Sequence, residues 1–372
     1  MRHAACLLWG MQNEVRVDLG DRSYGIRIGS ANLARLGEFC ASQGLTSACL
    51  IVTDSNVNSQ YGDACEETLR AVASRVHRAV VPSGEKAKSG EQLFALYDEA
   101  IAAGLDRGSF VVALGGGVVG DLAGYLAASF LRGIPYVQVP TTVVAMVDSA
   151  VGGKTGINLP HGKNLVGSFH QPVGVYTDLS TLGTLPDREY VSGLAEVVKY
   201  GVIWDAALFK LLENNVERLL RRDEDLLAQV VATSCDIKSQ VVHQDEREGG
   251  LRAILNFGHT LGHAIERVAG YEAYLHGEAI SIGMNFAADL SCRTHGLAIE
   301  EADRIRRLLA KFGLPLFAPD LVWPDLRDAI SVDKKTIGRL PRFVLADAIG
   351  TVAFGCEVGE SDLEEVWHGL GE

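Results

Sequence analysis

Residues 110–121, FVVALGGGVVGD, are the stretch that decides the fold. The apolar, β-branched run Phe110–Leu114 predicts a buried strand, which runs into Gly115–Gly117 and then into a helix. Glycines at such a turn let backbone amides approach a phosphate, and the helix N-terminus favours negative charge. The spacing is not G-x-G-x-x-G, so a plain tight turn explains this motif, taken alone, equally well.

Short strands and helices alternate on both sides of this stretch. Further strands are predicted at Ala48–Thr53, ending at Asp54, and at Tyr136–Val139, and Val80–Pro82 is predicted to be the end of another strand. Helical patterns lie between them at residues 32–43 and 90–103. This order predicts a parallel sheet that is covered on both faces, with ligands bound beyond the carboxyl ends of the strands.

The pattern changes from about Leu185, where strand-like runs fade and long amphipathic stretches follow. These are residues 189–203, 206–220, 225–242, 260–269, 278–294 and 300–312, with one hairpin near 343–345 and 351–353. We therefore expect an α/β, Rossmann-like nucleotide-binding domain over residues 1–181, of which 1–12 are an N-terminal extension. A mainly helical domain follows over residues 182–372, and the active site is expected in the cleft between them.

Composition narrows the class of protein. The net charge of −13 over 372 residues argues against nucleic acid or an anionic membrane as the main partner. Seven scattered cysteines without a Cys-x-x-Cys pair predict reduced thiols and a cytoplasmic location. The N-terminus does not have the pattern of a signal peptide, and glycines and Asp121 interrupt the apolar run 110–131, so it is not a membrane span.

Three histidines fall in a short window, in NFGHTLGH (256–263) and LHGE (275–278). His259 and His263 are spaced i, i+4, so on a helix they share one face, and His276 follows after a turn. Three imidazoles that converge on one point are typical of a binding site for zinc or a similar transition metal. Thr260 stands where a zinc protease has Glu, which excludes that motif. The alternative, helix-capping or core histidines, is weakened by the glycine beside each.

Lysines near glycines or carboxylates predict anion binding, although solvated charges are the alternative for each. The segment 140–164 reads as loop-rich, with Lys154 in Gly-Gly-Lys-Thr and Lys163 in Gly-Lys-Asn. Asp148 stands where a Walker loop needs glycine, so a nucleotide triphosphatase is excluded. Glu196 and Lys199 lie three residues apart on one predicted helix, a spacing that a surface ion pair usually explains. Their neighbours are apolar, which also fits a buried helix face, where Glu196 would bind a metal and Lys199 a substrate anion.

Taken in order, the motifs of this chain closely resemble those of the 3-dehydroquinate synthase family. The likeness runs from about Val15 to Ala353, and jointly its motifs are highly specific. They are Gly115–Asp121, Arg132-Gly133, Val139–Thr142, Met146–Ser149, Gly152–Asn158, Gly162–Asn164, Leu194–Gly201, Asn256–Glu266 and Leu275–Glu278. The resemblance implies an NAD- and divalent-metal-dependent carbon–oxygen lyase of the shikimate pathway, with Zn²⁺ or Co²⁺, acting on 3-deoxy-D-arabino-heptulosonate 7-phosphate.

The resemblance also implies roles for individual residues. The metal ligands would be Glu196, His259 and His276, which moves His263 to the phosphate or proton-transfer side. The NAD contacts would be Asp54, Asn56, Glu85, Lys88, Gly116, Gly117, Val118, Asp121, Thr141, Thr142, Asp148, Lys163, Thr184 and Leu185. The substrate contacts would be Arg132, Lys154, Asn164, Lys199, Lys238, Arg252, Asn256, His263 and Lys334 or Lys335. The catalytic residues among these sets would be Lys154, Lys199, His263, Asn164 and Asp148. Arg132 would reach a neighbouring subunit's site, which implies a homodimer.

Three alternatives stay open at this point. A related sugar-phosphate cyclase, making deoxy-scyllo-inosose or 2-epi-5-epi-valiolone, would use the same cofactors. The set Lys238, Arg252 and Asn256 suits a substrate carboxylate and favours dehydroquinate instead. An iron-alcohol-dehydrogenase-type polyol dehydrogenase shares the glycine-rich turn and the histidine-rich helix. A catalytically silent binding protein is disfavoured by the intact set of Glu196, His259 and His276.

Overall fold

The computed structural model describes residues 13–270, 273–332 and 341–370, and it divides into two compact units. The first unit runs to Leu185 and also takes in Glu224–His243, and the second comprises Pro186–Asp223 and the chain from Gln244 onward. The expected fold class is confirmed, because the first unit is an α/β structure with a mainly parallel sheet and the second is mostly helical. The expectation for Lys334 and Lys335 falls outside the described residues.

The first unit is built on a seven-stranded sheet. Its strands are parallel except for the antiparallel pair β1–β2 at one edge. Across the sheet the order is β1 (Asn13–Val17), β2 (Tyr24–Gly29), β9 (Gly174–Asp178), β6 (Tyr136–Pro140), β5 (Phe110–Gly115), β3 (Ala48–Asp54) and β4 (Arg75–Val81). The strands expected from continuous apolar runs are confirmed, whereas β1, β2 and β9 were not predicted.

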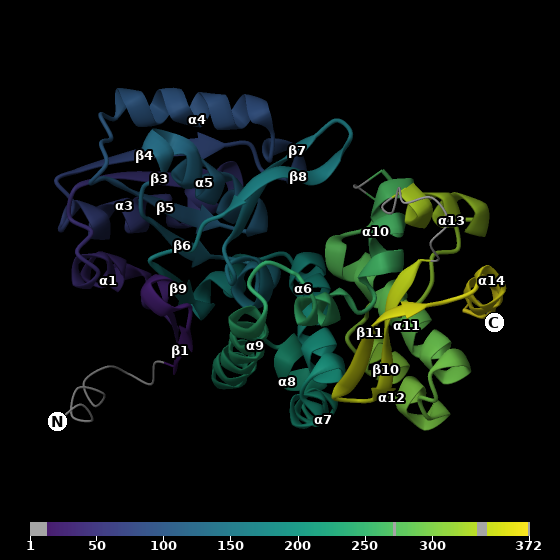
Figure 1. Cartoon of the computed structure of the whole chain (residues 1–372). Helices are drawn as coiled ribbons and strands as arrows, with labels where there is room; N and C mark the ends of the chain where they lie inside the picture. The colour runs from purple at the N-terminus through teal and green to yellow at the C-terminus, as the bar shows by residue number, and fades with distance from the viewer. Residues whose placement is uncertain (1–12, 271–272, 333–340, 371–372) are drawn as a thin grey trace. The chain divides into compact units, whose positions relative to one another are not determined.

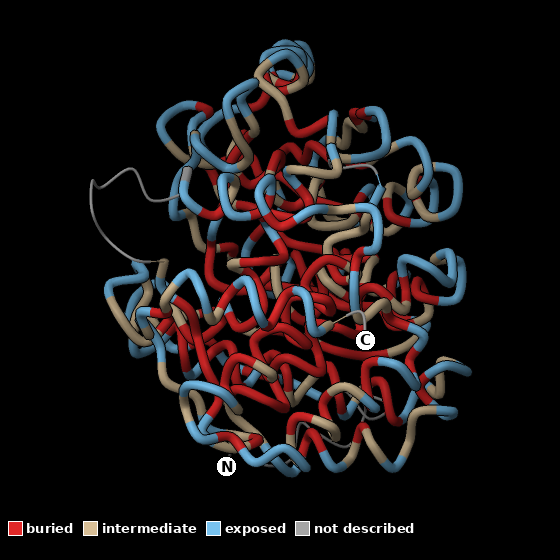
Figure 2. The backbone as a smooth tube through the Cα atoms, turned by 90° about the vertical axis from the view of Figure 1, so that its right-hand side faces the viewer, coloured by how far each residue is buried: buried red, intermediate tan, exposed pale blue. Residues whose placement is uncertain are grey.

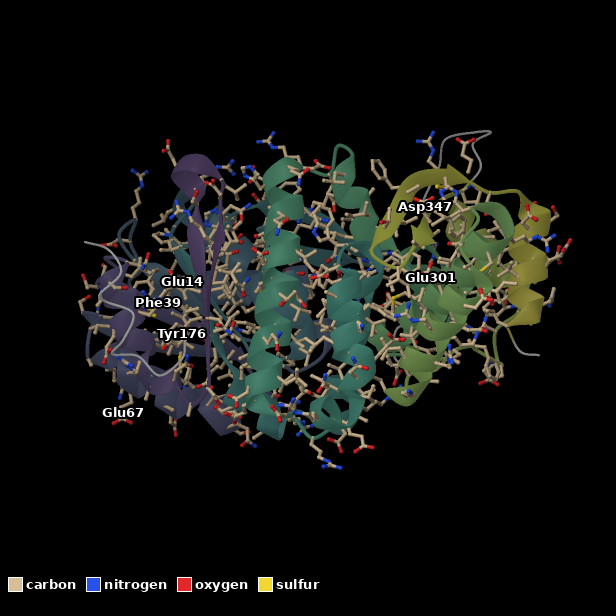
Figure 3. The ribbon with its side chains drawn as sticks, turned by 90° about the horizontal axis from the view of Figure 1, so that it is seen from below. Glu14, Phe39, Glu67, Tyr176, Glu301 and Asp347 are labelled. Atoms are coloured by element: carbon tan, nitrogen blue, oxygen red, sulfur yellow. The ribbon has the colours of Figure 1, made fainter. Side chains whose placement is uncertain are left out.

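Helices cover both faces of this sheet, as predicted (Figure 1). One face carries α4 (Gly90–Ala102) and α5 (Gly117–Ser129), and the other carries α1 (Leu36–Ser42) and α3 (Asp63–Arg70). Successive residues of a strand point to opposite faces, so Leu50 of β3 packs on the face covered by α4 and α5, and Ile51 on the face covered by α1 and α3. On the α1 side the rings of Phe39 and Tyr176 lie 5.1 Å apart (Figure 3).

Residues 154–169 form a hairpin rather than the loop that the sequence suggested. Strands β7 (Lys154–Leu159) and β8 (Gly162–Phe169) pair antiparallel. Their three glycines hide the alternation of apolar and polar residues by which a strand is recognised. The loop prediction for this part of 140–164 is therefore wrong. The hairpin carries Lys154 on β7 and Lys163 and Asn164 on β8.

Helix α9 (Glu224–Gln244) packs with the first unit, although sequence reasoning assigned it to the helical domain. Its contacts explain the difference. Cys235 Sγ donates to the carbonyl of Met146 at 3.2 Å, and the ring of His243 is bonded to the carbonyl of Asp18 at 2.8 Å. These are tertiary contacts to distant parts of the chain, which the pattern of α9 alone does not contain.

The second unit consists of helices around one short hairpin. The helices are α6 (Asp187–Ile203), α7 (Ala206–Asn214), α8 (Val216–Leu220), α10 (His259–Val268), α11 (His276–Thr294), α12 (Ile299–Lys311), α13 (Trp323–Val332) and α14 (Glu360–Gly369). The predicted helix 206–220 is interrupted at Asn215, and the others match their expected ranges closely. The predicted hairpin is β10 (Arg342–Ala348) and β11 (Thr351–Glu357).

The core of the second unit forms where α10, α11 and α13 pack against β10. Phe286 of α11 contacts the rings of both Trp323 and Phe343, with centroids 6.5 and 6.1 Å away. Buried stretches of the backbone are red in Figure 2 and exposed stretches are pale blue. Within the described part of the chain, every helix falls short of the length and apolarity needed to cross a membrane.

Candidate metal and substrate site

Backbone contacts between three helices of the second unit create the candidate site. A Cβ placed at Gly277 of α11 would lie 1.7 Å from the carbonyl oxygen of Ser192 on α6, so only glycine fits. Likewise, a Cβ at Gly283 of α11 would lie 1.9 Å from the carbonyl oxygen of Gly258, just before α10. The Gly277 amide also donates to Ser192 Oγ at 3.0 Å. Residues beside these contacts on α6, α10 and α11 are therefore forced together.

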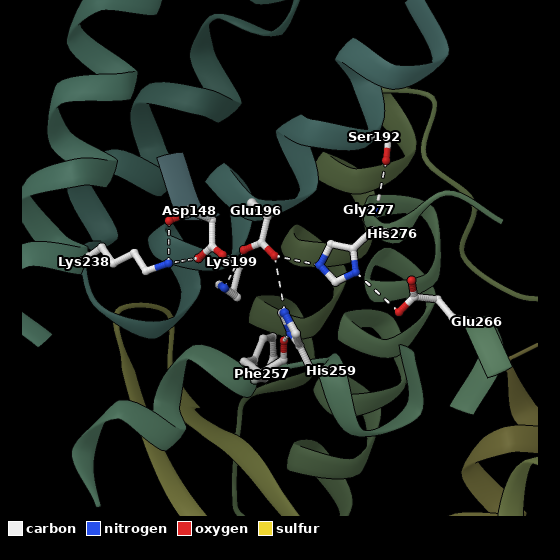
Figure 4. A network of polar contacts seen from close by, with 10 residues as sticks. All are labelled: Asp148, Ser192, Glu196, Lys199, Lys238, Phe257, His259, Glu266, His276 and Gly277. Atoms are coloured by element: carbon white, nitrogen blue, oxygen red, sulfur yellow. Dashed lines mark hydrogen bonds and ion pairs between the residues drawn. The ribbon is translucent and has the colours of Figure 1, made fainter. Parts of the chain in front are cut away.

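Those neighbouring residues are Glu196, His259 and His276 (Figure 4). Glu196 Oε1 lies 3.3 Å from His259 Nε2 and 3.2 Å from His276 Nε2. One ligand atom from each of the three lies within 4.8 Å of the other two. Glu196 and His259 are buried, and His276 is half-buried. One carboxylate oxygen and two imidazole nitrogens are a common ligand set for Zn²⁺ in enzymes.

The hydrogen bonds on the far sides of the two imidazoles fit a metal site. His259 Nδ1 is bonded to the carbonyl oxygen of Phe257 at 3.1 Å, so Nδ1 carries the proton and donates. His276 Nδ1 faces Glu266 Oε2 at 3.5 Å. Both bonds leave Nε2 as the nitrogen that faces Glu196 with a free lone pair in the neutral ring. The donor set and the tautomers that its partners favour therefore suit a divalent cation.

Lys199 adds a positive charge to the same place. Its Nζ lies 2.5 Å from Glu196 Oε2, and both side chains are about 1% exposed. Burial raises the pKa of Glu196, but Lys199 and the contacts with the two imidazoles outweigh it and hold that pKa well below its usual range. Burial and the charge of Lys199 lower the pKa of His259. Burial also lowers the pKa of His276, but its bonds to Glu196 and Glu266 prevail and raise it to about 10.

The other substrate residues expected in the second unit lie on α10 and on the 3-10 turn just before it. His263 is exposed on α10, with its ring centroid 5.3 Å from that of His259 and 6.2 Å from that of His276. Together with Glu266 and His276 it forms a second group of ligand atoms within 4.8 Å of one another. Arg252 is fully buried on the 3-10 turn Leu251–Asn256, and its Nη1 donates to the Glu246 carbonyl at 2.5 Å.

In the first unit, expected NAD and phosphate residues gather beside the sheet. Lys88 is buried, and its Nζ donates to both Asp121 of α5 and Asn164 of β8. Burial raises the pKa of Asp121 in spite of the neighbouring Lys88. Glu85 accepts from Asn158 Nδ2 at 2.7 Å and lies 3.9 Å from Lys163 Nζ.

A second polar pair in this unit joins α9 to the turn after β6. Lys238 Nζ donates at 2.7 Å to both Oδ1 and the backbone carbonyl of Asp148 (Figure 4). Lys238 thus belongs to the first unit, whereas Arg252 and Asn256, with which it was grouped from the sequence, belong to the second. Thr141 is buried and Thr142 accepts from the Ala145 amide at 3.2 Å.

The remaining expected residues lie at strand ends and turns of the first unit. Asp54 caps the short helix α2 (Ser55–Val57), which contains Asn56, by accepting from two backbone amides at 2.8 and 3.1 Å. Thr184, next to Leu185, is bonded to the hydroxyl of Tyr61 at 2.8 Å. Gly116, Gly117 and Val118 form the N-terminus of α5. Lys154 is exposed, as is Arg132, whose φ is +72°.

Sequence reasoning did not assign a role to Glu266. The signal was present in the spacing, because Glu266 follows His259 by seven residues and His263 by three, which places all three on one face of α10. It is 5% exposed and contacts the imidazole of His276. Buried carboxylates of this kind are costly unless they are bonded, so its position calls for an explanation.

Family models match most of the chain. Residues 78–192 match the model for the N-terminal part of 3-dehydroquinate synthase, and residues 193–336 match that for the C-terminal part. The 3-dehydroquinate synthase of Desulforamulus reducens is 49% identical over 351 residues, which are 94% of this chain and 98% of the relative. That of Geobacter sp. strain M21 is 48% identical over 337 residues, 91% of this chain and 93% of the relative.

Solved structures of sugar-phosphate cyclases share the whole fold. The 2-epi-5-epi-valiolone synthase of Streptomyces hygroscopicus subsp. jinggangensis, with NAD⁺ and Zn²⁺ bound, is 28% identical with a TM-score of 0.86, covering 98% of this chain and 99% of its own. A 2-deoxy-scyllo-inosose synthase, complexed with carbaglucose-6-phosphate, NAD⁺ and Co²⁺, is 27% identical with a TM-score of 0.87, covering 95% and 99%. Because the two family models match residues 78–336 and the synthases of Desulforamulus reducens and Geobacter sp. strain M21 match more than nine tenths of the chain, the chain belongs to the 3-dehydroquinate synthase family.

Proposed function

We propose that this chain is a 3-dehydroquinate synthase, which converts 3-deoxy-D-arabino-heptulosonate 7-phosphate to 3-dehydroquinate and phosphate. Phosphate leaves by elimination, the ring opens, and an intramolecular aldol closes the carbocycle, so the enzyme is a carbon–oxygen lyase. Relatives that are 48–49% identical over more than nine tenths of the chain support this activity. The single structural observation that carries the proposal is the buried convergence of Glu196, His259 and His276.

NAD and a divalent cation, Zn²⁺ or Co²⁺, are the cofactors of the proposal. Structural relatives bind both, and the ligand set of two imidazoles and one carboxylate suits either ion. When bound, NAD takes a hydride from the substrate and returns it in the same turnover, and the cation polarises substrate oxygens as a Lewis acid. Glu196, His259 and His276 would hold the cation, and the residues around Asp54, Lys88 and Asp121 would hold NAD.

The chain's own residues orient the substrate and handle its charge. Because Asn164 Oδ1 accepts from Lys88, the amide nitrogen of Asn164 is the group left to donate to a phosphate oxygen. Lys154 and His263 are exposed, so each can bind a phosphate dianion, and the His263 imidazole can also transfer a proton. Lys199 is held by Glu196, and Lys238 by Asp148, so neither ammonium needs to be ordered when substrate binds.

Arg252 favours a substrate with a carboxylate over the sugar phosphates of the related cyclases. Its guanidinium is about 1% exposed, and its ion pair with Glu248 is loose, at 3.7 Å. Among the described residues its Nε has no hydrogen-bond partner. A buried guanidinium is costly unless it is paired and hydrogen-bonded, and a carboxylate can do both in bidentate geometry. A substrate without a carboxylate leaves that cost in place.

The proposal includes a homodimer in the cytoplasm. Arg132 is exposed and held at positive φ, next to Leu131, which is also exposed at positive φ. A non-glycine residue at positive φ is uncommon and recurs at functional sites, which supports a role for Arg132 in a neighbouring subunit's site. All six described cysteines are free thiols, as expected in a reducing compartment. Light scattering of the purified protein tests the dimer.

The test is incubation with the heptulosonate phosphate, NAD and Zn²⁺, scoring phosphate release and the product by NMR. We expect phosphate and dehydroquinate in equal amounts without net formation of NADH. The His276→Ala variant should lose turnover, and glucose 6-phosphate should replace the substrate poorly. Activity retained in metal-depleted His276→Ala protein would overturn the site, and net NADH from glycerol would indicate a polyol dehydrogenase instead.

A further inference from the structure

One imidazole in the candidate site joins two buried carboxylates. His276 Nε2 lies 3.2 Å from Glu196 Oε1, and His276 Nδ1 lies 3.5 Å from Glu266 Oε2 on the opposite side of the ring (Figure 4). Glu196 comes from α6 and Glu266 from α10, while His276 is the first residue of α11. The ring is therefore held between two other helices rather than by its own.

The two histidine ligands differ in what holds their Nδ1 atoms. His259 has a neutral acceptor, the carbonyl oxygen of Phe257, and its side chain is 11% exposed. His276 has a charged acceptor, Glu266, and its side chain is 33% exposed. The more exposed ring has more freedom to rotate and to exchange its proton with water. The Glu266 carboxylate contacts this more exposed ring, that of His276.

We infer that Glu266 is a positioning residue, which accepts the Nδ1 proton of His276 and so keeps the Nε2 lone pair aimed at the cation. A carboxylate on the far nitrogen fixes the tautomer and the orientation of the ring and makes Nε2 more basic toward a metal. Glu266 itself touches neither the cation nor the substrate in this role. The inference rests on the proposed function, because it presumes that Glu196, His259 and His276 bind a divalent cation.

The experiment compares Glu266→Gln and Glu266→Ala with the wild-type chain. Gln keeps the size of the side chain and an acceptor oxygen but loses the charge, whereas Ala removes the contact. The matched control is Glu364→Gln, because Glu364 forms an exposed pair with His368 at 3.9 Å. Zinc affinity is measured by competition with a chelator, binding stoichiometry by titration, and the ligand geometry by the absorption spectrum of the Co²⁺ form.

We expect zinc affinity to fall by about 10-fold to 100-fold in Glu266→Ala, and by less in Glu266→Gln. The Co²⁺ spectrum should shift in both variants and stay unchanged in Glu364→Gln. A merely structural role would lower the melting temperature but leave the spectrum and the affinity unchanged. If Glu266→Ala does not fold, the isosteric Gln variant alone decides.

Three outcomes would count against the inference or its premise in distinguishable ways. Zinc affinity within about twofold of wild type in the Glu266 variants, with an unshifted spectrum, would overturn the positioning role alone. A wild-type chain that binds two zinc ions, and a Glu266→Gln chain that binds one, would make Glu266 a direct metal ligand in the group with His263 and His276. That result would also overturn the positioning role. Wild-type protein that does not bind zinc would overturn the proposed function itself.

Discussion

Replacing Gly277 by alanine tests whether close helix packing creates the metal site. The added Cβ would lie 1.7 Å from the carbonyl oxygen of Ser192 and 2.4 Å from its carbonyl carbon, both backbone atoms. Rotating a side chain cannot relieve such a contact. Ordinary van der Waals contact begins near 3.4 Å, so α11 and α6 must separate by about 1.7 Å at this point.

The size of that shift sets the expected effects. Zinc–ligand bonds are about 2.0–2.1 Å long, so a displacement of this size prevents His276 and Glu196 from binding one ion together. We expect zinc affinity to fall by about 100-fold or more, because misplacement of a group by about 1 Å already costs about that much in a preorganised site. Forcing an extra methyl group into a packed interior costs about 1–3 kcal/mol of folding free energy, or a few degrees in Tm.

The assay is zinc binding by chelator competition together with thermal unfolding of the metal-free protein. Gly369→Ala is the matched control, because it makes the same chemical change at the end of α14 with open space around the new methyl group. The control should bind zinc like the wild-type chain. Wild-type zinc affinity and an unchanged Tm in Gly277→Ala would refute the reasoning that backbone contact between α6 and α11 creates the site.

Three further predictions concern pH, thiols and a helix cap. Because the metal-free pKa of His276 is raised to about 10, this ring is protonated at neutral pH and must lose its proton to bind a cation. Apparent zinc affinity should therefore rise by about tenfold per pH unit between pH 6 and 8, and a flat calorimetric profile would contradict this. Burial raises the pKa of all six described cysteine thiols, but only Cys292 and Cys356 are partly exposed, so iodoacetamide should modify native protein first at these two. Mass spectrometry showing early modification at the other four would contradict the packing of Cys40, Cys49, Cys65 and Cys235. Asp205 accepts from two amides at 2.8 and 3.1 Å at the start of α7, so Asp205→Ala should lower the free energy of unfolding by about 1 kcal/mol in denaturant titrations and leave zinc affinity unchanged.

The fold class was predictable where local patterns decide the structure. Strands β3 and β5 are buried on both faces, which requires continuous apolar runs, and such runs are visible in one sequence. The hairpin β7–β8 was missed because glycines break the alternation of its strands. The place of α9 depends on contacts such as Cys235 to Met146, which join residues far apart in the chain.

The candidate site was only partly predictable, for the same reason. The i, i+4 pair His259 and His263 was visible as a shared helix face, yet His263 is exposed and the nearest carboxylate to His259 comes from Glu196, on an earlier helix. No spacing rule links residues so far apart. Apolar neighbours suggested Glu196 as a buried metal ligand, but only the resemblance to a known family grouped it with His259 and His276. Neither line of reasoning pointed to Glu266, whose role depends on its contact with His276.

The most direct measurement is an anomalous difference map at the zinc edge from a crystal of the zinc-loaded protein. We predict one peak within about 2.0–2.2 Å of a Glu196 carboxylate oxygen, His259 Nε2 and His276 Nε2. A peak between His263, Glu266 and His276, or a zinc ion bound elsewhere with these three side chains pointing apart, would contradict the account.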